Sequence, residues 1–347
     1  MGHATATVAA QQQPPCGGTA ALPALSLAFA LLALGWGLLA RARSETWWWV
    51  AALDAVPPQV LLPVPLLLAW WALRRRRWGW AGVNAAVVAA FTVGQVGLVL
   101  PHGSSGTGAS GTPLRVLTLN TDFAGTDPAR LAALARRERV DLLTLQEALG
   151  RDREAGYEVR VRAAFPGWTL TRHDELLTLS RWPVLASRVI SFPRSPHAVL
   201  LTRVRVAGQT VIVVNTHLPT LGLLPSASDT RLGRALPQRV ARRLSVRRDF
   251  VEVVERVLRD GPGPVILAGD LNAPPRGELH ARLRVLGLTD TFQAGGAGFG
   301  FTHHARFGHS RIDSVWTRGT LAERVTPLPD LLSDHRALLA ALRLPAP

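Results

Sequence analysis

The sequence predicts an α/β domain that follows about three membrane-spanning α-helices. Three observations lead to this fold class. Residues 1–101 contain long apolar runs with almost no charge, residues 102–113 are rich in Gly, Ser and Thr, and residues 114–347 alternate short apolar strand patterns with helix patterns. A chain of 347 residues that is 48% hydrophobic is predicted to fold into one or two domains. We therefore expect a membrane anchor at 1–101, a flexible linker at 102–113 and a soluble domain at 114–347.

The anchor is predicted to contain three spans, at about residues 22–40, 47–73 and 78–100. A helix of roughly 20 apolar residues crosses a hydrocarbon core of ~30 Å, and the first and third runs carry no charged side chain. Three tryptophans open the second run, as expected at a membrane interface, and four prolines predict a kink in it. Asp54 is the only charge of the second run, and we expect it to be solvated at the interface.

The arginines near the spans predict the orientation of the chain. The block Arg74–Arg77 is expected to stay in the cytoplasm, against only Arg41 and Arg43 on the other side. This predicts a multi-pass plasma-membrane protein with a cytoplasmic N-terminus and an extracytoplasmic soluble domain. A cleaved signal sequence is the alternative for the first run, although no arginine precedes it and no clear cleavage site follows it.

Composition excludes some functions and weakens the case for others. All 39 basic residues are arginine, which is typical of a GC-rich coding source, so the net charge of +15 is a poor indicator of nucleic-acid binding. Six arginines and two acids precede residue 114, which leaves 33 arginines and 22 acids, a net charge of +11, in the soluble domain. Cys16 is the only cysteine, so an intrachain disulfide and a cysteine zinc site are both excluded.

The soluble domain alternates strands and helices in chain order. Asp127 and Pro128 are typical of a helix start, and residues 245–260 form an amphipathic pattern with Phe250 and Val254 on the apolar face. Strands are predicted at 114–119, 141–145, 176–179, 184–190, 199–206, 210–214, 264–268, 312–316 and 336–342.

Polar residues follow many of these strands at the point where each strand ends. A single Asn or Asp after a strand is most often a turn former. Six such positions in one domain indicate a functional site instead, because strand ends and their loops gather at one rim of an α/β fold. The six positions are Asn120, Glu147, Asn215–His217, Asp270–Asn272, Asp313 and Asp334–His335.

Taken together, these segments resemble the endonuclease/exonuclease/phosphatase superfamily, which has the DNase I-like fold. The matching segments, in order, are LTLN ending at Asn120, LQE ending at Glu147, LSRWP at 179–183, NTHL at 215–218, GDLN at 269–272, RID at 311–313 and SDH at 333–335. The resemblance covers about residues 114–343. It implies a four-layered α/β sandwich with two packed, mostly antiparallel sheets.

The resemblance also implies a divalent cation and an attacking water. Glu147 would be the main ligand of Mg²⁺ or Mn²⁺, with Asn120 beside it and Asp334 nearby, since these cations take oxygen ligands. Asp270 would orient or deprotonate the water, and Asn272 would hold a phosphate oxygen.

Two histidines complete the implied catalytic set. His335, oriented by Asp313, would contact the scissile phosphate, and His217 would stabilise the pentacovalent phosphate or protonate the leaving oxygen. Either Asp174 or Glu175 could pair with His217. Weaker candidates are Asp122 as a metal neighbour, His303 and His304 at a second metal, and Arg194 near phosphate. Arg181 of the LSRWP segment is expected to be structural.

The function predicted from the sequence is a membrane-anchored, divalent-metal-dependent phosphodiester hydrolase, foremost a nonspecific nuclease outside the cytoplasm. The alternative enzyme is a phospholipid or small phosphate-ester hydrolase, either sphingomyelinase-like or phosphatase-like, and another class is a catalytically idle membrane scaffold or sensor. The stretch Arg231–Arg248 holds seven arginines that could bind a nucleic-acid backbone or lipid headgroups, or form a solvated face. The N-terminal helices imply contact with the lipid bilayer, and no protein partner can be inferred.

Overall fold

The computed structural model describes residues 20–101, 110–150, 156–193, 195–225, 229–230, 233–304, 306–330 and 332–346. The chain divides into two compact units. We call residues 20–35 and 60–91 the helical unit, and residues 36–59 and 92–346 the α/β unit. Most of the predicted linker, at 102–109, lies outside the described residues, and the first strand begins inside the rest of it, at Thr112.

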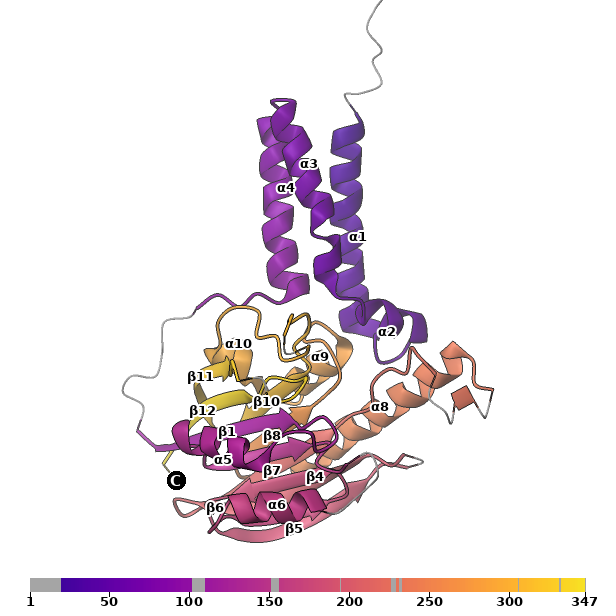
Figure 1. Cartoon of the computed structure of the whole chain (residues 1–347). Coiled ribbons are helices and arrows are strands. Elements are labelled where there is room, and N and C mark those ends of the chain that lie inside the picture. The colour runs from indigo at the N-terminus through magenta and orange to yellow at the C-terminus, as the bar shows by residue number, and fades with distance from the viewer. Residues whose placement is uncertain are drawn as a thin grey trace, which may run out of the picture. The chain divides into compact units, whose positions relative to one another are not determined.

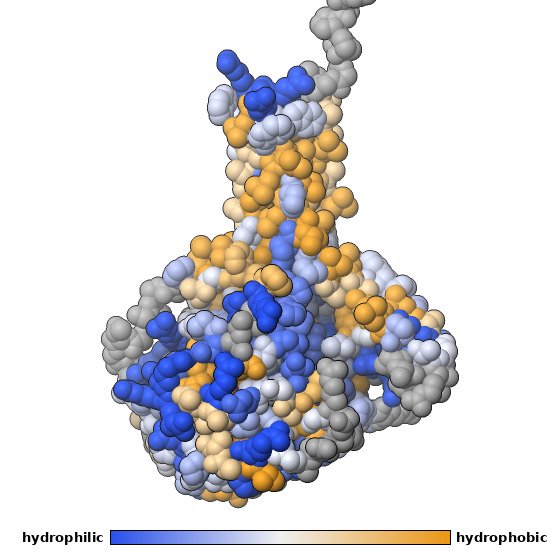
Figure 2. Space-filling view, in the orientation of Figure 1, coloured by the Kyte–Doolittle hydropathy of each residue, from blue (hydrophilic) through white to orange (hydrophobic). Residues whose placement is uncertain are grey.

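Packing in the helical unit joins the start of α1 (Ala21–Arg43) to α3 (Pro63–Arg74) and α4 (Trp78–Phe91). Leu22, Leu68 and Ala72 are buried between these helices, and Asn84 Nδ2 donates to Ser26 Oγ at 2.9 Å. Apolar side chains cover most of the face of this unit that Figure 2 shows, and the leucines at 31, 32 and 67 are between 62% and 74% exposed. A soluble protein rarely exposes such a surface, whereas lipid covers it readily.

Two helical stretches are long and apolar enough to cross a membrane, and a third candidate is broken. The two are α1 and Trp78–Val96, the latter formed by α4 and a π-helical turn, Thr92–Val96. The third pairs α2 (Trp48–Asp54) with Pro58–Arg74 across a bend of 75°. This bend falls at the first two prolines of the predicted 47–73 span, where the sequence indicates a kink.

Residues 44–59 belong to the α/β unit, and Asp54 is not solvated as the sequence suggested. Its side chain is 4% exposed and lies 2.7 Å from Arg276 Nε. Ala51 of α2 packs with Leu221 and Leu244. The solvation prediction was wrong because the partner of Asp54 is more than 200 residues away in the sequence.

Two six-stranded sheets form the centre of the α/β unit (Figure 1), in the orders β11-β12-β1-β2-β4-β3 and β5-β6-β7-β8-β10-β9. Only the β1–β2 and β7–β8 neighbours are parallel among these pairs, so the predicted mostly antiparallel arrangement is confirmed. The strands are β1 (Thr112–Asn120), β2 (Leu142–Gln146), β3 (Thr169–His173), β4 (Leu176–Ser180), β5 (Val184–Ser191), β6 (Ala198–Val206), β7 (Gln209–His217), β8 (Val265–Asp270), β9 (Thr289–Asp290), β10 (Asp313–Arg318), β11 (Leu321–Pro327) and β12 (Leu338–Leu344).

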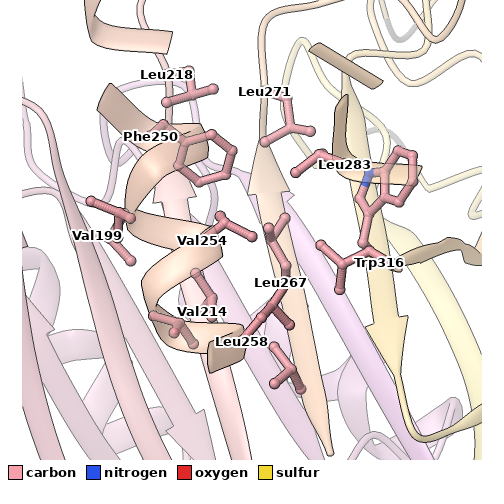
Figure 3. Close-up of a cluster of buried hydrophobic side chains, with 14 of the residues drawn as sticks. Val199, Val214, Leu218, Phe250, Val254, Leu258, Leu267, Leu271, Leu283 and Trp316 are labelled. Carbon is pink, nitrogen blue, oxygen red and sulfur yellow. The ribbon is translucent and has the colours of Figure 1, made fainter. Parts of the chain in front are cut away.

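Alternating side chains along the strands build three apolar layers, one between the two sheets and one between each sheet and the helices on its outer face. Two sheets and two helical layers therefore make four layers of secondary structure. Val265 and Leu267 of β8 face one cluster with helix α8, while Ile266 faces the cluster between the sheets. Figure 3 shows Phe250, Val254 and Leu258 of α8 on the outer face of that sheet. The helices are α5 (Pro128–Arg137), α6 (Gly156–Ala164), α8 (Leu236–Asp260), α9 (Glu278–Val285) and α10 (Thr291–Gly295). The four-layered α/β sandwich is therefore confirmed.

Local signals explain where two of these helices begin. Asp127 caps α5 by accepting from the Ala129 N–H at 3.1 Å, and proline occupies the first turn, as the sequence predicted. Helix α8 begins at Leu236, nine residues before the predicted start at 245. The extra turns bury Val240 and Leu244 against Ala51, a tertiary contact that periodicity within α8 does not reveal.

His280 of α9 is fully buried and predicts a loss of stability in acid. Its Nε2 lies 3.1 Å from the Ala273 carbonyl, and burial lowers the pKa of His280 to about 3. An unfolded histidine titrates near pH ~6.5, so the unfolded state binds more protons below that pH and folding weakens as pH falls. We expect His280→Gln to flatten the fall in unfolding free energy between pH 7 and 5, measured by urea titration of the full chain in detergent micelles. His173→Gln is the control, and an equal acid slope in wild type and the His280 variant would contradict this reading.

Candidate active site

Strand register brings the predicted residues of one sheet to the same rim. In the sheet that contains β7, β8 and β10, His217 pairs with Asp270, and Asp270 pairs with Asp313. In the other sheet, Asn120 at the end of β1 pairs with the last residue of β2, and Glu147 follows directly. Residues from five separate motifs therefore lie at adjacent strand ends.

Asn120 connects the two sheets at this rim. Its Nδ2 donates to Glu147 Oε1 at 3.0 Å and to Asp270 Oδ2 at 3.1 Å. The second Glu147 oxygen accepts from the Phe123 N–H at 3.2 Å, and Glu147 itself has a φ of 50°, in the left-handed region. Strain of this kind persists where the surroundings fix the residue, and it often marks a functional position.

Two histidines flank the same oxygen of Asp270. Asp270 is 1% exposed, and its Oδ2 lies 3.8 Å from His217 Nε2 and 3.9 Å from His335 Nε2. Glu147 Oε1 is 3.7 Å from His217 Nε2. Two imidazoles and two carboxylates thus surround one small volume, as the sequence predicted.

Each histidine also has its own carboxylate partner on the far side of the ring. His217 Nδ1 lies 3.0 Å from Glu175 Oε1, which selects Glu175 rather than Asp174 between the two predicted candidates. His335 Nδ1 lies 2.7 Å from Asp313 Oδ2, as predicted. A carboxylate at Nδ1 fixes the orientation of the ring and leaves Nε2 facing Asp270.

These carboxylates hold both histidines in the cationic form near neutral pH. Burial alone would lower the pKa of His217, but the hydrogen bond and charge of Glu175 outweigh it and raise that pKa to about 9. Burial likewise opposes the charge of Asp313, which raises the pKa of His335 to about 10. Two imidazolium groups favour binding of a phosphate anion.

Asn272 and Asp334, the remaining predicted residues, lie close to this set. The Asn272 N–H donates to Asp270 Oδ1 at 2.9 Å, and its Nδ2 donates to the Leu218 carbonyl at 2.8 Å. Asp334 lies with His303 and His335 in a group whose potential ligand atoms are all within 4.8 Å of one another. The His303 ring is centred 4.7 Å from the His335 ring.

Sequence reasoning missed His197 and Ser333. The His197 ring stands edge-on to His217 at 5.7 Å, and its Nδ1 lies 3.9 Å from Glu175 Oε1. Ser333 Oγ accepts from the His335 N–H at 2.9 Å and donates to the Asn120 carbonyl at 2.7 Å. No motif surrounds His197, so the sequence gives no signal for it. Ser333 belongs to the SDH segment, and its position in that segment could have identified it as a site residue.

Of the weaker candidates, Arg181 is exposed and lies 3.9 Å from Asp141 at the surface, and Arg194 lies outside the described residues. The Asp122 N–H donates to Asn120 Oδ1 at 3.1 Å.

Most described arginines of the 231–248 stretch form ion pairs or hydrogen bonds within the α/β unit. Arg247 is 2% exposed and lies 3.1 Å from Glu45, and Arg248 donates to the Glu45 carbonyl at 2.8 Å. Arg234 and Arg243 each lie 3.4 Å from Asp229. The stretch is therefore not the solvated face that its composition allowed; Arg231 lies outside the described residues.

The part of the site around Glu147 and Asn120 offers oxygen ligands that suit a hard divalent cation. Burial, together with the charges of Glu175 and Asp270, raises the pKa of Glu147 despite its hydrogen bond from Asn120. A nearby cation would relieve that unfavourable burial of negative charge. Carboxylate and amide oxygens are the donors that Mg²⁺ and Mn²⁺ prefer.

A pocket of about 390 Å³ adjoins the site. Asn272 and His303 line it on the catalytic side, and the loop 220–224 lines another wall. Residues 54–58 line it as well, so the segment that runs from the end of α2 toward α3 contributes to the pocket.

The fold and the site together define a two-sheet α/β protein with two carboxylate-paired histidines at one rim. Residues 117–335 match the Endonuclease/Exonuclease/phosphatase family, and the chain belongs to that family. Members of the superfamily hydrolyse phosphoester bonds and generally depend on a divalent metal ion.

Solved structures share the fold at low sequence identity. An endonuclease/exonuclease/phosphatase family protein from Bacteroides thetaiotaomicron is 15% identical, with a TM-score of 0.52 over 68% of this chain and 100% of that one. A Bacteroides vulgatus endonuclease/exonuclease/phosphatase is 16% identical, with a TM-score of 0.51 over 67% and 99%. D. rerio TDP2, complexed with single strand DNA product, is 17% identical, with a TM-score of 0.50 over 67% and 99%. Among curated protein sequences, none matches this chain significantly.

Proposed function

We propose that this chain is a membrane-anchored, divalent-metal-dependent phosphoester hydrolase. One observation carries the proposal: His217 and His335, each paired with a carboxylate, flank Asp270 within 3.9 Å, while Asn120 joins Asp270 to Glu147. An idle scaffold or sensor has no physical need for this arrangement, in which two like charges are held close together by buried acids.

The proposed reaction is in-line attack of water on phosphorus. Asp270 orients the water and accepts its proton as the new P–O bond forms. His335 binds a non-bridging phosphate oxygen, and His217 donates its proton to the leaving alkoxide as the old P–O bond breaks. A divalent cation held by Glu147 and Asn120, with Asp334 nearby, would neutralise charge on the phosphate oxygens.

The anchor is proposed to place this chemistry outside the cytoplasm. Helix α1 and Trp78–Val96 would each cross the membrane, and Pro58–Arg74 would supply the third span. The N-terminus and Arg74–Arg77 would then share the cytoplasmic side, as the positive-inside rule favours. We propose the plasma membrane as the location of this multi-pass protein.

For the substrate, we infer a small or lipid phosphoester rather than a nucleic-acid backbone. The arginines that could have bound DNA or RNA instead contact Glu45, Asp229 and backbone carbonyls. The neighbouring pocket of about 390 Å³ has the size of a small-molecule site and is bounded by residues 54–58. The nonspecific nuclease predicted from the sequence becomes the alternative that the same assay tests.

A substrate panel tests this function in the full chain, purified in detergent micelles. We expect Mg²⁺ or Mn²⁺ to support hydrolysis of phospholipids or a generic bis-phosphodiester, and EDTA to abolish it. Cleavage of plasmid DNA or RNA with no turnover of the smaller esters would favour the nuclease, and no turnover of any substrate would contradict the proposed function.

Metal binding has a readout that does not depend on turnover. We expect Mg²⁺ or Mn²⁺ to raise the Tm of the full chain, because a ligand that binds only the folded state stabilises it by about 2.7 kcal/mol at 100 times Kd. Glu147→Gln should lose most of this shift, and Glu255→Gln, at an exposed position of α8, should keep it. An equal metal-induced rise in Tm in both variants would show that Glu147 is not a ligand of the metal.

A further inference from the structure

A second pocket, of about 350 Å³, is lined by four arginines and by no acid among the residues that the structure describes. These are Arg41, Arg276, Arg284 and Arg311. The pocket lies wholly within the α/β unit and shares part of one wall, including Arg276, with the pocket beside the active site.

Two of the four arginines have a close acidic partner of their own, a third shares one of those acids at longer distance, and the fourth has none among the described residues. Arg276 lies 2.7 Å from Asp54, and Arg311 lies 2.8 Å from Asp290. Arg284, which is 33% exposed, reaches Asp290 only at 4.0 Å. Arg41 is exposed and has no acidic partner within 4.0 Å among the described residues. Four cations around two buried acids leave an excess of positive charge facing the pocket.

Arg41 and Arg284 both line the pocket, and their positive charges repel each other. Burial lowers the pKa of Arg284, Asp290 opposes this, and the charges of Arg41 and Arg311 lower it further. An anion in the pocket would relieve this repulsion between like charges. Arginine guanidinium groups match the oxygens of phosphate in particular, because they can donate two parallel hydrogen bonds.

The pocket lies where two candidate spans end. Arg41 is in the last turn of α1, and residues 93–97 come from the end of Trp78–Val96 and the residue after it. Phe299 and Phe301 also line the pocket and stack with ring centroids 5.1 Å apart. The ends of helices that cross a membrane lie at the headgroup level of the bilayer.

We propose that this pocket, which we call the arginine pocket, binds the phosphate of an anionic phospholipid headgroup. Arg41, which has no acidic partner among the described residues, and Arg284, which shares Asp290 with Arg311, supply the excess positive charge, and the stacked phenylalanines contact the start of the acyl chains. Basic pockets beside membrane helices bind such headgroups through the same attraction. None of the residues that line the arginine pocket has a role in the proposed reaction, so lipid bound there is a resident ligand and not the substrate.

Native mass spectrometry of the full chain tests the arginine pocket. The Asp270→Asn background slows turnover by roughly 10²-fold or more, and the micelles contain equimolar phosphatidylglycerol and phosphatidylcholine. We expect phosphatidylglycerol to be retained roughly tenfold or more in excess, and Arg41→Gln with Arg284→Gln to reduce that preference to near unity. Arg130→Gln, at an exposed position of α5, is the matched control and should keep the preference.

Each other outcome overturns the proposal. Equal retention of the two lipids by the parent protein would exclude selection for an anionic headgroup. A preference that survives in the double variant would place the lipid elsewhere. Displacement of the lipid by millimolar inorganic phosphate would show that the pocket binds soluble phosphate instead. The single Arg41→Gln variant, which alters only an exposed side chain, gives the same test if the double variant unfolds.

Discussion

Asp270→Asn is expected to lower kcat by roughly 10²-fold or more with the fold retained. The substitution keeps the size of the side chain but removes the charge and the basic oxygen at the centre of the site. Asp270 Oδ2 is the atom that both histidines face, at 3.8 and 3.9 Å. Loss of a general base or of a group that acts in the transition state usually costs this much.

The measurement is steady-state hydrolysis of the best substrate from the panel, with saturating Mg²⁺ so that weaker metal binding does not limit the rate. Asp260→Asn, at an exposed position at the end of α8, is the matched control and should keep the wild-type kcat. His335→Ala should also lose roughly 10²-fold. A near-wild-type rate in either active-site variant would remove that residue from the mechanism.

Glu45→Ala is expected to reduce the free energy of unfolding by about 3–5 kcal/mol, which is the usual cost of breaking a buried ion pair. Glu45 and Arg247 are 4% and 2% exposed, and their charged atoms lie 3.1 Å apart. Removing the carboxylate leaves the guanidinium buried without its counter-charge. Arg247 also donates to the Asn272 carbonyl, so we expect kcat to fall as well.

Two further variants separate charge pairing from packing. The double variant Glu45→Met with Arg247→Met should recover most of the lost stability, because an apolar pair avoids the buried charge. Glu323→Gln breaks the partly exposed pair with Arg343 and should cost only about 0–1 kcal/mol. Urea unfolding followed by circular dichroism measures all of them, and a loss below 1 kcal/mol in Glu45→Ala would contradict the expectation.

The sequence predicted the rim of the site well because strand ends carry its residues. Asn120, Glu147 and Asp270 each follow a short apolar run, and strand register alone brings such positions together. The choice between Asp174 and Glu175 could not be made in this way. Asp174 takes a φ of 48° in the turn between β3 and β4, and that turn decides which of two adjacent acids faces His217.

The contacts of residues 44–58 were beyond sequence reasoning for a different reason. Glu45 and Asp54 pair with arginines more than 200 residues away, and no periodicity or motif connects them. The apolar residues around Asp54 are as compatible with a membrane span as with packing against protein. Composition alone therefore predicted that this segment contacts lipid. The roles of Arg247 and Arg276 were hidden likewise, because a structural arginine and a ligand-binding arginine look the same in a sequence.

The contacts of residues 44–58 with the rest of the α/β unit make this protein unsuitable for truncation before residue 112. A fragment that starts at residue 112 would strip the counter-ions from Arg247 and Arg276 and uncover Leu221 and Leu244. It would also open one side of the cavity next to the catalytic rim. Such a fragment should aggregate or have low activity, even though every proposed catalytic residue is present. Solubilisation of the whole chain is therefore the better route to an active preparation.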